Sequence, residues 1–255
     1  MKKIDLKKVS EYVEKNIDTF HRKRLESLEG MALKKILERK NPYLFKAKNI
    51  LTAQDLVKTL LDAFLQSQEE TMFGDFTEGV AIFVSNQING GIKSKALIGI
   101  DLEFERDGNY YIVEIKSGPN WGNSSQIKKM KDNFAAAKAQ LKGKNVIAIN
   151  GCCYGKDNQP DKGDYQKLCG QRFWTFISGE ENFYTDMIEP FGYKAKEKNE
   201  EFLIAYSKMI NRFTREFYND FCDKDGGIDW KKLVEFNSSA SKVSKKLPDT
   251  DGGAE

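Results

Sequence analysis

The chain has 255 residues, of which 40% are hydrophobic and 12% aromatic, so it can bury a sizeable core. Its 41 basic and 38 acidic residues leave a net charge of +3, which is too balanced to identify a polyanion-binding protein. The four cysteines lack the paired C-x2-C spacing of a zinc site and are too few for a disulfide framework. They exclude a small disulfide-rich secreted fold and favour reduced thiols.

The first seventy residues are predicted to be helical. Apolar residues recur at helical spacing over residues 9–20 and again over residues 51–65. Asn41-Pro42 breaks the chain between these segments, and Thr52 begins a Thr-Ala-Gln-Asp sequence that is typical of a helix N-cap. Residues 1–70 are therefore expected to form a helical N-terminal region that packs on the core.

A further helix is predicted over residues 72–86, where it carries Glu78 and leads into a loop at Gly90-Gly91. One strand of the region is weakly marked, and two segments are candidates for it. It lies either at residues 81–85 or at residues 91–96.

The most informative segment is a predicted β-hairpin, in which two strands of alternating apolar residues flank an Asp107-Gly108 turn. If the loop has two residues, Arg106 pairs with Asn109. Counting outward from that pair then places Asp101 directly opposite Glu114, so two carboxylates meet across the ladder.

Because side chains alternate along a strand, Glu114 and Lys116 share the face of Asp101, while Val113 and Ile115 point to the other side. Like charges opposite each other cost roughly 0.2–1 kcal/mol of stability. A divalent cation bound between the two carboxylates is the simplest reason for such a pair. The alternative is an edge hairpin with a solvated charged face, in which Lys116 only offsets the acids.

The rest of the chain continues the alternation of helices and strands. A helix is expected over residues 124–141, a strand over 145–150, and a long loop over 154–170. An amphipathic helix follows over residues 202–221, and Asp229 is expected to cap a last short helix. The order through the strand at 145–150 is helix, strand, strand, helix, strand, with the weakly marked strand in addition.

The Asp-x(12)-Glu-x-Lys cluster of Asp101, Glu114 and Lys116 resembles the active site of the PD-(D/E)xK nuclease superfamily. The segment that follows, Ser-Gly-Pro-Asn-Trp-Gly-Asn-Ser at residues 117–124, resembles the one after the lysine in type II restriction endonucleases. Ile100 stands where the motif name has proline.

This resemblance implies an α/β (α+β) fold with the αβββαβ core of restriction endonucleases, a mixed sheet flanked by helices, and helical N-terminal and C-terminal extensions. Residues 71–237 would form the nuclease core with its C-terminal helical extension. The polar residues 238–255 are expected to be a disordered tail.

The resemblance also implies Mg²⁺ as cofactor, bound by Asp101 and Glu114 with the Ile115 carbonyl as a further oxygen ligand. Lys116 would position or activate the attacking water, and hydrolysis would leave 5′-phosphate and 3′-hydroxyl ends. Superfamily members often place an extra acid on the helix before the hairpin. Glu78 is the candidate for that acid, and Asp75 is its rival.

DNA contacts are expected from the residues after the lysine, which would either contact the DNA backbone or cap the next helix: Asn120, Asn123, Ser124, Ser125 and Gln126. Ser124 as a plain N-cap is the structural alternative. Base reading requires donors in the major groove, for which the candidates are Gln171, Arg172, and Arg212 or Arg215.

Three further runs, at residues 41–46, 74–79 and 173–179, are similar to segments of restriction enzymes that cut GGNCC-related palindromes, so the resemblance extends over most of residues 40–235. His21 is the only histidine and lies in a predicted helix face as a surface or hydrogen-bonded residue, which argues against nuclease mechanisms with a histidine base or nucleophile.

The sequence therefore predicts a magnesium-dependent type II restriction endonuclease that acts on double-stranded DNA as a homodimer. Its functional partner would be a cognate DNA methyltransferase of the same system. The alternatives are a DNA repair or recombination nuclease on the same core, and an inactive DNA-binding module. No secretory hydrophobic region and no run of eighteen apolar residues occurs, so a cytoplasmic protein without membrane association is expected.

Overall fold

The computed structural model describes residues 3–240. The chain divides into two compact units, one of Met1–Glu29 with Leu65–Ala205 and one of Gly30–Phe64 with Tyr206–Glu255. The predicted limit at residue 70 falls inside helix α4 (Ala53–Asn89), and the domain division at that limit stays a prediction. Most of the predicted tail, residues 241–255, lies outside the described residues.

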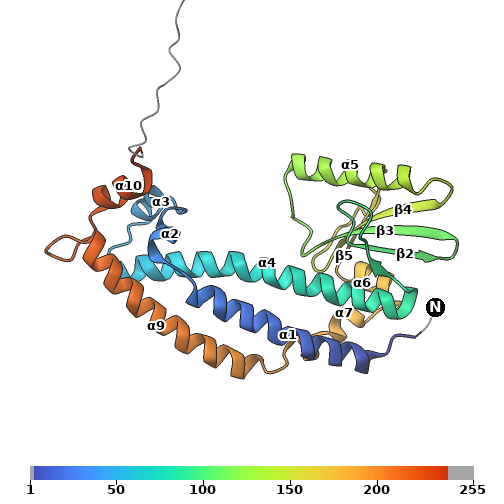
Figure 1. Ribbon diagram of the computed structural model, residues 1–255, viewed down its shortest axis with the longest axis horizontal. Coiled ribbons are helices and arrows are strands. Elements are labelled where there is room, and N and C mark those ends of the chain that lie inside the picture. The colour runs from blue at the N-terminus through green and yellow to red at the C-terminus, as the bar shows by residue number, and fades with distance from the viewer. Residues whose placement is uncertain (1–2, 241–255) are drawn as a thin grey trace, which may run out of the picture. The chain divides into compact units, whose positions relative to one another are not determined.

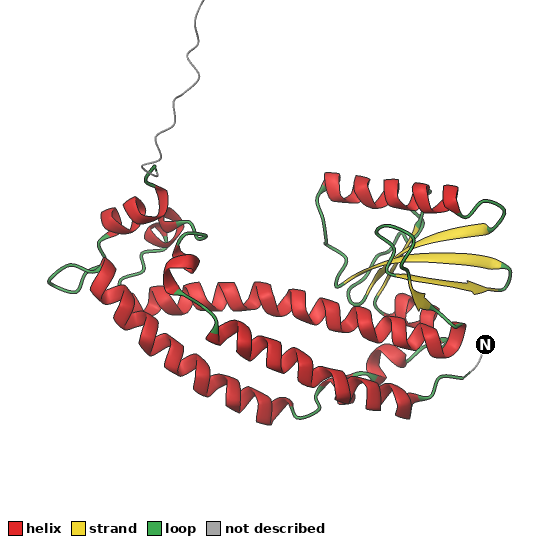
Figure 2. Ribbon diagram, in the orientation of Figure 1, coloured by secondary structure: helices red, strands yellow, loops and turns green. Residues whose placement is uncertain are grey.

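The first unit contains a mixed five-stranded sheet with the strand order β1-β2-β3-β4-β5 (Figure 2). The first three strands pair antiparallel, while β3, β4 and β5 pair parallel. The strand bounds are β1 (Ile92–Lys93), β2 (Leu102–Arg106), β3 (Asn109–Lys116), β4 (Asn145–Cys152) and β5 (Gln166–Cys169).

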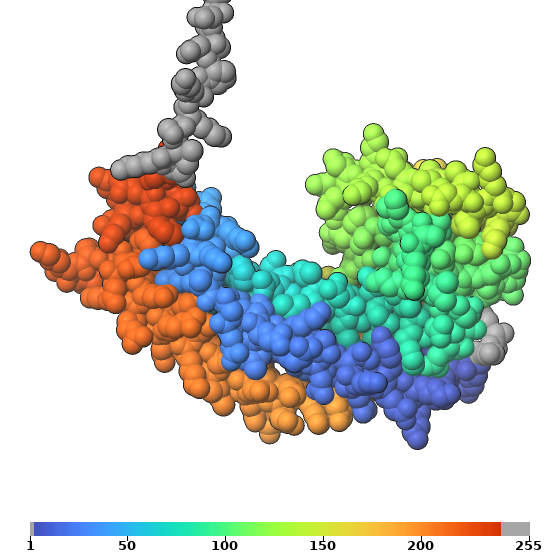
Figure 3. Space-filling view, in the orientation of Figure 1, coloured from blue at the N-terminus to red at the C-terminus, as the bar shows by residue number. Residues whose placement is uncertain are grey.

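Helices cover both faces of this sheet (Figure 1). On one face, buried residues of α1 (Leu6–Glu29), α4 and α6 (Gln171–Ser178) pack against Val113 and Ile115 of β3. On the other face, Met130 and Phe134 of α5 (Ser124–Gln140) pack against Ile112 of β3 and Ala148 of β4. In the space-filling view the side chains of α5 form an outer surface of this unit (Figure 3).

The remaining helices of the first unit are short, except for the start of α9. They are α7 (Phe183–Asp186), α8 (Ile188–Phe191) and the first part of α9 (Ala195–Phe221). The predicted helix at residues 202–221 thus begins earlier than its apolar pattern indicates, at Ala195. The first turns of α9 are polar, so their periodicity is weak.

The αβββαβ order predicted from the sequence is confirmed by α4, β1, β2, β3, α5 and β4. The weakly marked strand is β1, so the candidate at 91–96 is correct, and residues 81–85 are helical. The predicted helices at 51–65 and 72–86 are one helix, α4. The polar residues 66–71, which separate the two apolar patterns, are also helical and lie exposed or half-buried on α4.

The predicted loop at residues 154–170 contains the fifth strand, β5, which the sequence reading missed. Only four residues long, β5 pairs with the end of β4 and has no alternating pattern of its own. It follows an irregular segment in which Gln166 also forms an isolated bridge with Asp161.

The second unit is built from α2 (Leu33–Leu37), α3 (Pro42–Ala47), α10 (Trp230–Ser238) and the remaining parts of α4 and α9. The Asn41 side chain caps α3 by accepting from the Tyr43 amide at 3.0 Å. The Asp229 side chain caps α10, as predicted. The core consists of buried aliphatic and aromatic side chains: Ile36, Phe45, Leu56, Leu60, Met209, Phe213, Phe217 and Leu233.

All four cysteines are thiols without a disulfide partner, as the sequence predicts. Over residues 3–240, no helix is both long enough and apolar enough to cross a membrane.

The close packing of β4 against α6 gives a stability prediction. A Cβ added to Gly151 of β4 would overlap the fully buried Phe173 ring, so Gly151→Ala should lower the free energy of unfolding by about 1–3 kcal/mol. Urea denaturation at fixed pH measures this loss.

Gly74→Ala is the matched control, because an added Cβ there lies 3.8 Å from the Ser117 Cβ, an ordinary contact, inside α4. This variant should gain about 0.5–1 kcal/mol from helix propensity. Equal stability of the two variants would contradict the described packing of Gly151 against Phe173.

Candidate active site

The hairpin has the register that the Asp107-Gly108 turn predicts, since Arg106 pairs with Asn109 and the ladder runs outward to Leu102 and Val113. Asp107 and Gly108 both have positive φ, at 51° and 74°, as a tight hairpin turn of this kind requires. The sequence therefore determines the alignment of β2 and β3.

Asp101 is nevertheless not the ladder partner of Glu114, so this detail of the prediction is wrong. The ladder ends at Leu102, and the Asp101 amide donates to the Val113 carbonyl at 2.9 Å. The Asp101 carboxylate accepts instead from the Ile115 amide at 2.7 Å. A side-chain oxygen thus takes the position in which a continuing strand would offer a backbone carbonyl, and it holds Asp101 against the end of β3.

Glu114 points to the α5 side of the sheet and is only 8% exposed. One of its carboxylate oxygens, Oε1, lies 2.7 Å from the Lys116 Nζ. The other, Oε2, is buried and has no hydrogen-bond partner. A buried carboxylate oxygen without a partner is costly and calls for a cation or a water.

A second lysine pairs with the extra acid predicted on α4. The Lys93 Nζ, on β1, lies 3.0 Å from Glu78 Oε1. This bond is the main cause that raises the pKa of Lys93, and Asp101 and Asp75 add to it. Glu78 is among the charges that raise the pKa of Asp101.

Burial is the main cause that raises the pKa of Asp101, to about 6. The charges of Glu78 and Glu114 raise it further, while the Ile115 amide and the Lys116 ammonium oppose the shift. A cation bound beside such a carboxylate would stabilise its ionised form and lower its pKa.

The residues present fit a magnesium site. Asp101 and Glu114 supply two carboxylates, and the unpartnered Glu114 Oε2 is an available oxygen. Within residues 3–240, no three His, Cys, Asp or Glu side chains form a complete metal cage. Magnesium does not require one, since it commonly binds one or two carboxylates and takes its remaining ligands from water and substrate phosphate.

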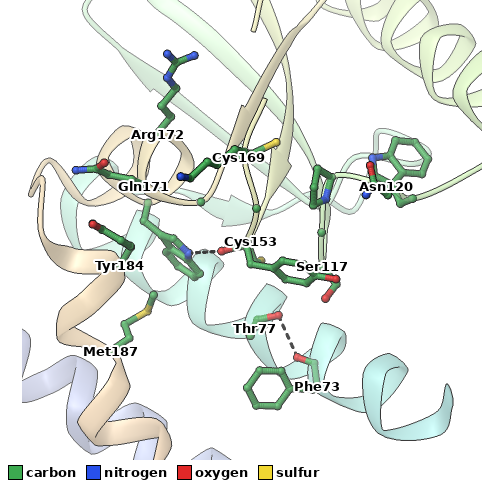
Figure 4. A pocket seen from close by; sticks show the side chains of 18 of the residues that line it. Phe73, Thr77, Ser117, Asn120, Cys153, Cys169, Gln171, Arg172, Tyr184 and Met187 are labelled. Atoms are coloured by element: carbon green, nitrogen blue, oxygen red, sulfur yellow. Dashed lines mark hydrogen bonds between the residues drawn. The ribbon is translucent and has the colours of Figure 1, made fainter. Parts of the chain in front are cut away.

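A cavity of about 1210 Å³ opens at the carboxyl ends of β3, β4 and β5. Its lining includes Ser117 and Asn120 after β3, Cys153 at the end of β4, and Arg172 at the start of α6 (Figure 4). The Trp174 indole donates to the Cys153 carbonyl at 2.7 Å in its wall. Burial raises the pKa of Cys153 to about 12, so this cysteine is a neutral thiol at pH 7 and not a nucleophile.

The predicted DNA-contacting residues after the lysine divide into two groups. Asn120 lines the cavity. Asn123, and not Ser124, is the N-cap of α5. It forms a capping box with Gln126, in which the Asn123 side chain accepts from the Gln126 amide and the Gln126 side chain from the Asn123 amide. Ser124 and Ser125 are exposed residues of the first turn.

The candidate base readers are also separated. Arg172 lines the cavity and donates to the Asp157 carbonyl at 3.3 Å, while the Gln171 side chain donates to the Glu181 carbonyl. Arg212 belongs to the second unit, where it donates to the Met31 carbonyl at 3.1 Å. Arg215 lies in the same unit and lines a small surface pocket there.

His21 is not the surface or hydrogen-bonded residue that was expected. Both ring nitrogens are buried without a hydrogen-bond partner. Burial lowers the pKa of His21, so the ring is neutral at pH 7.

The structure adds two residues that the sequence reading did not place at the site, Asn150 and Trp121. Asn150 is fully buried next to Glu114 in the parallel ladder of β3 and β4. Its position in an apolar strand, Val-Ile-Ala-Ile-Asn, is a signal that could have marked it, because a polar residue in a buried strand needs a partner.

Comparison with protein families identifies the family of this chain. The family model of the type II restriction endonuclease EcoO109I matches residues 7–199, which include the whole hairpin and the five-stranded sheet. The chain belongs to this restriction endonuclease family. The mixed sheet flanked by helices agrees with the restriction-endonuclease-like fold predicted from the sequence. A comparison with curated proteins found no match.

The raised pKa of Asp101 gives a prediction for the metal-free restriction endonuclease. Because the folded pKa of about 6 lies above the ordinary 3.8, ionisation of Asp101 favours unfolding at pH 7, and this penalty shrinks as the pH falls from 6 toward 3.8. Asp101→Asn keeps an oxygen for the Ile115 amide and should raise the free energy of unfolding by on the order of 1–3 kcal/mol at pH 7.

Urea denaturation in excess chelator measures this difference at pH 7 and at pH 5. The extra free energy of unfolding of Asp101→Asn over wild type should fall to about half at pH 5, since much of the wild-type Asp101 carboxyl is then protonated. A variant that is less stable than wild type at both pH values would contradict the burial of an uncompensated charge.

Proposed function

We propose that this chain is a magnesium-dependent type II restriction endonuclease that cuts double-stranded DNA at a specific sequence and leaves 5′-phosphate and 3′-hydroxyl ends. The observation that carries the proposal is the buried, unpartnered Glu114 Oε2, which lies on the strand whose Ile115 amide holds the Asp101 carboxylate. Membership of the EcoO109I family supports it.

In this proposal Asp101 and Glu114 hold Mg²⁺, with the Ile115 carbonyl as a further ligand. The bound ion would supply Lewis-acid chemistry at the scissile phosphate and lower the pKa of water. Asp101 stays oriented through its bond to the Ile115 amide, so one of its oxygens remains directed toward the end of β3.

Lys116 is proposed to hold the attacking water beside the scissile phosphate. In the metal-free protein its ammonium is bound to Glu114 Oε1, at 2.7 Å. If Glu114 held a cation, the Lys116 ammonium would be available to the water. Glu78 is proposed as the extra acid, and it is paired with Lys93.

The DNA would approach the carboxyl ends of β3, β4 and β5, where the cavity opens beside Ser117. Asn120 and Arg172 are the proposed contacts among the residues that line it. Asn123, Ser124 and Gln126 begin α5, and the exposed first turn of that helix is proposed to face the DNA backbone.

Recognition of a GGNCC-related palindrome is part of the proposal and rests on the similarity of the runs at 41–46, 74–79 and 173–179 to enzymes with such sites. A cognate DNA methyltransferase, encoded next to this chain, would protect the host genome. Its gene should be found beside the gene of this protein.

Two other functions are less well supported. A repair or recombination nuclease could use the same core, but the family match is to a restriction endonuclease. An inactive DNA-binding module would have no use for the ion-paired Glu114 and Lys116 beside a buried, hard-to-ionise Asp101.

Digestion of a plasmid of known sequence tests the function. With Mg²⁺ the purified chain should give discrete bands, while Asp101→Ala, Glu114→Ala and Lys116→Ala should each lose at least about a hundredfold of the cleavage rate, because each removes a metal ligand or the group beside the water. Gel electrophoresis resolves the bands, and end-labelling identifies the 5′-phosphate.

Glu105→Ala is the matched control on β2, since Glu105 is an exposed acid paired with Lys144 at 3.5 Å. It should cut at the wild-type rate. Calcium should support specific binding without turnover in wild type and Lys116→Ala. A smear or structure-dependent cuts would favour the repair nuclease, and no cleavage by wild type with any divalent cation would favour the inactive module.

A two-fold homodimer is expected as the active unit, because one Asp101, Glu114 and Lys116 cluster addresses one phosphodiester and a palindromic duplex presents two. We propose that the interface involves α9 and the N-terminal helices. Phe213 and Phe217 of α9 are buried within the chain, so other residues of these helices would form it.

Light scattering with and without a specific duplex tests the dimer. In the DNA complex, the protein part of the mass should be twice the mass of one chain. A monomer under both conditions, together with nicking of one strand per encounter, would contradict it.

A further inference from the structure

Asn150, in the interior strand β4, is the only fully buried side-chain amide in the described core. Its Nδ2 donates to the backbone carbonyl of Glu114 at 3.3 Å. Its Oδ1 accepts from the Trp121 indole at 3.0 Å. Both functional groups of the amide are therefore used, which compensates its burial.

Trp121 lies in the segment between β3 and α5, and its two ends have different partners. The indole N–H is bound to Asn150. The ring lies under the Lys116 ammonium, with Nζ 4.9 Å from its centroid. Trp121 also packs against the buried core on the α5 face of the sheet, as does Ile127 of α5.

These contacts form a closed network of four residues. Lys116 touches Glu114 and the Trp121 ring, Trp121 is bound to Asn150, and Asn150 returns to Glu114. If Glu114 held a metal ion, Lys116 would lose its salt bridge. The Trp121 ring face would then be the described contact that keeps the ammonium in position, since cations bind well over the face of an indole.

We propose that Trp121 is a positioning residue for Lys116 and that Asn150 fixes the ring in the orientation that this requires. The inference rests on the proposed nuclease function. Without the ring, the released lysine would sample many rotamers or stay on Glu114, so cleavage would slow and more metal would be needed. DNA binding would be unchanged, because Trp121 acts through Lys116.

Three substitutions separate the two roles of the indole. Trp121→Leu removes both the ring and the N–H, and it should slow single-turnover cleavage by about 10–100-fold at saturating Mg²⁺. Trp121→Phe keeps an aromatic ring but removes the hydrogen bond to Asn150, and its cleavage rate should fall less. Asn150→Ala keeps the indole ring but removes the same hydrogen bond, so its cleavage rate should resemble that of Trp121→Phe.

Trp230→Leu is the matched control, since its ring also lies near a lysine, with Lys46 Nζ at 5.5 Å, but in the second unit. It should cut at the wild-type rate. Affinity for the specific duplex in calcium should be equal in wild type and the Trp121 variants. Melting temperatures identify any variant that fails to fold.

Fluorescence provides a readout that does not depend on cleavage. Lys116→Met should alter the tryptophan emission of the wild-type chain, because it removes a cation from the Trp121 ring, but should leave the emission of Trp121→Phe unchanged. If Lys116→Met changed the emission equally in the wild-type chain and in Trp121→Phe, or changed neither, the proposed contact between Lys116 and Trp121 would be wrong.

The two hypotheses fail in different ways. If wild type cuts DNA and Trp121→Leu cuts at the same rate, the positioning role is wrong and the nuclease function stands. If Trp121→Leu slows cleavage only by weakening duplex affinity, Trp121 is a DNA contact and the inference is also wrong. If wild type does not cut at all, the proposed function fails, and the positioning role fails with it.

Discussion

The bond from the Ile115 amide to the Asp101 carboxylate is the interaction on which the site depends. The β2–β3 ladder stops at Leu102, so backbone pairing does not bring Asp101 to Glu114. The carboxylate replaces the missing carbonyl acceptor and holds the two acids at the same strand end. Burial of Asp101 at this position is the main reason for the raised pKa of its carboxyl, and the bond to the Ile115 amide opposes that shift.

The electrostatics of the metal-free site follow from that arrangement. The charges of Glu78 and Glu114 both act on Asp101, and two lysines, Lys93 and Lys116, pair with Glu78 and Glu114. Like charges in a buried place are unfavourable unless they are compensated. The lysines compensate in part, and the unpartnered oxygen of Glu114 shows where compensation is incomplete.

The sheet supplies the rigid support for this chemistry. Strand β3 has partners on both sides, and its apolar residues are buried against helices on both faces. Lys116 is its last residue. The next residue, Ser117, lines the cavity, whereas Asp101, Glu114 and Lys116 are not among its lining residues. A site at the end of a well-packed strand holds its side chains more firmly than one in a loop.

The sequence by itself determined the hairpin, its register as far as Leu102 and Val113, and the shared face of Glu114 and Lys116, because strand alternation and the Asp-Gly turn are local rules that Asp107-Gly108 and Tyr111 to Lys116 obey. It did not determine the position of Asp101, which is held by a side-chain hydrogen bond beyond the end of the ladder. It also indicated the αβββαβ order. It did not determine that α4 is one helix or that β5 exists, since both segments are weakly patterned in sequence. The Asn123 cap of α5 is local, because its partner Gln126 is three residues away, so the sequence contained a signal for it. Only the tertiary structure joined Asn150 and Trp121 to Lys116, because hydrogen bonds between β4 and a distant loop leave no periodic trace in the chain.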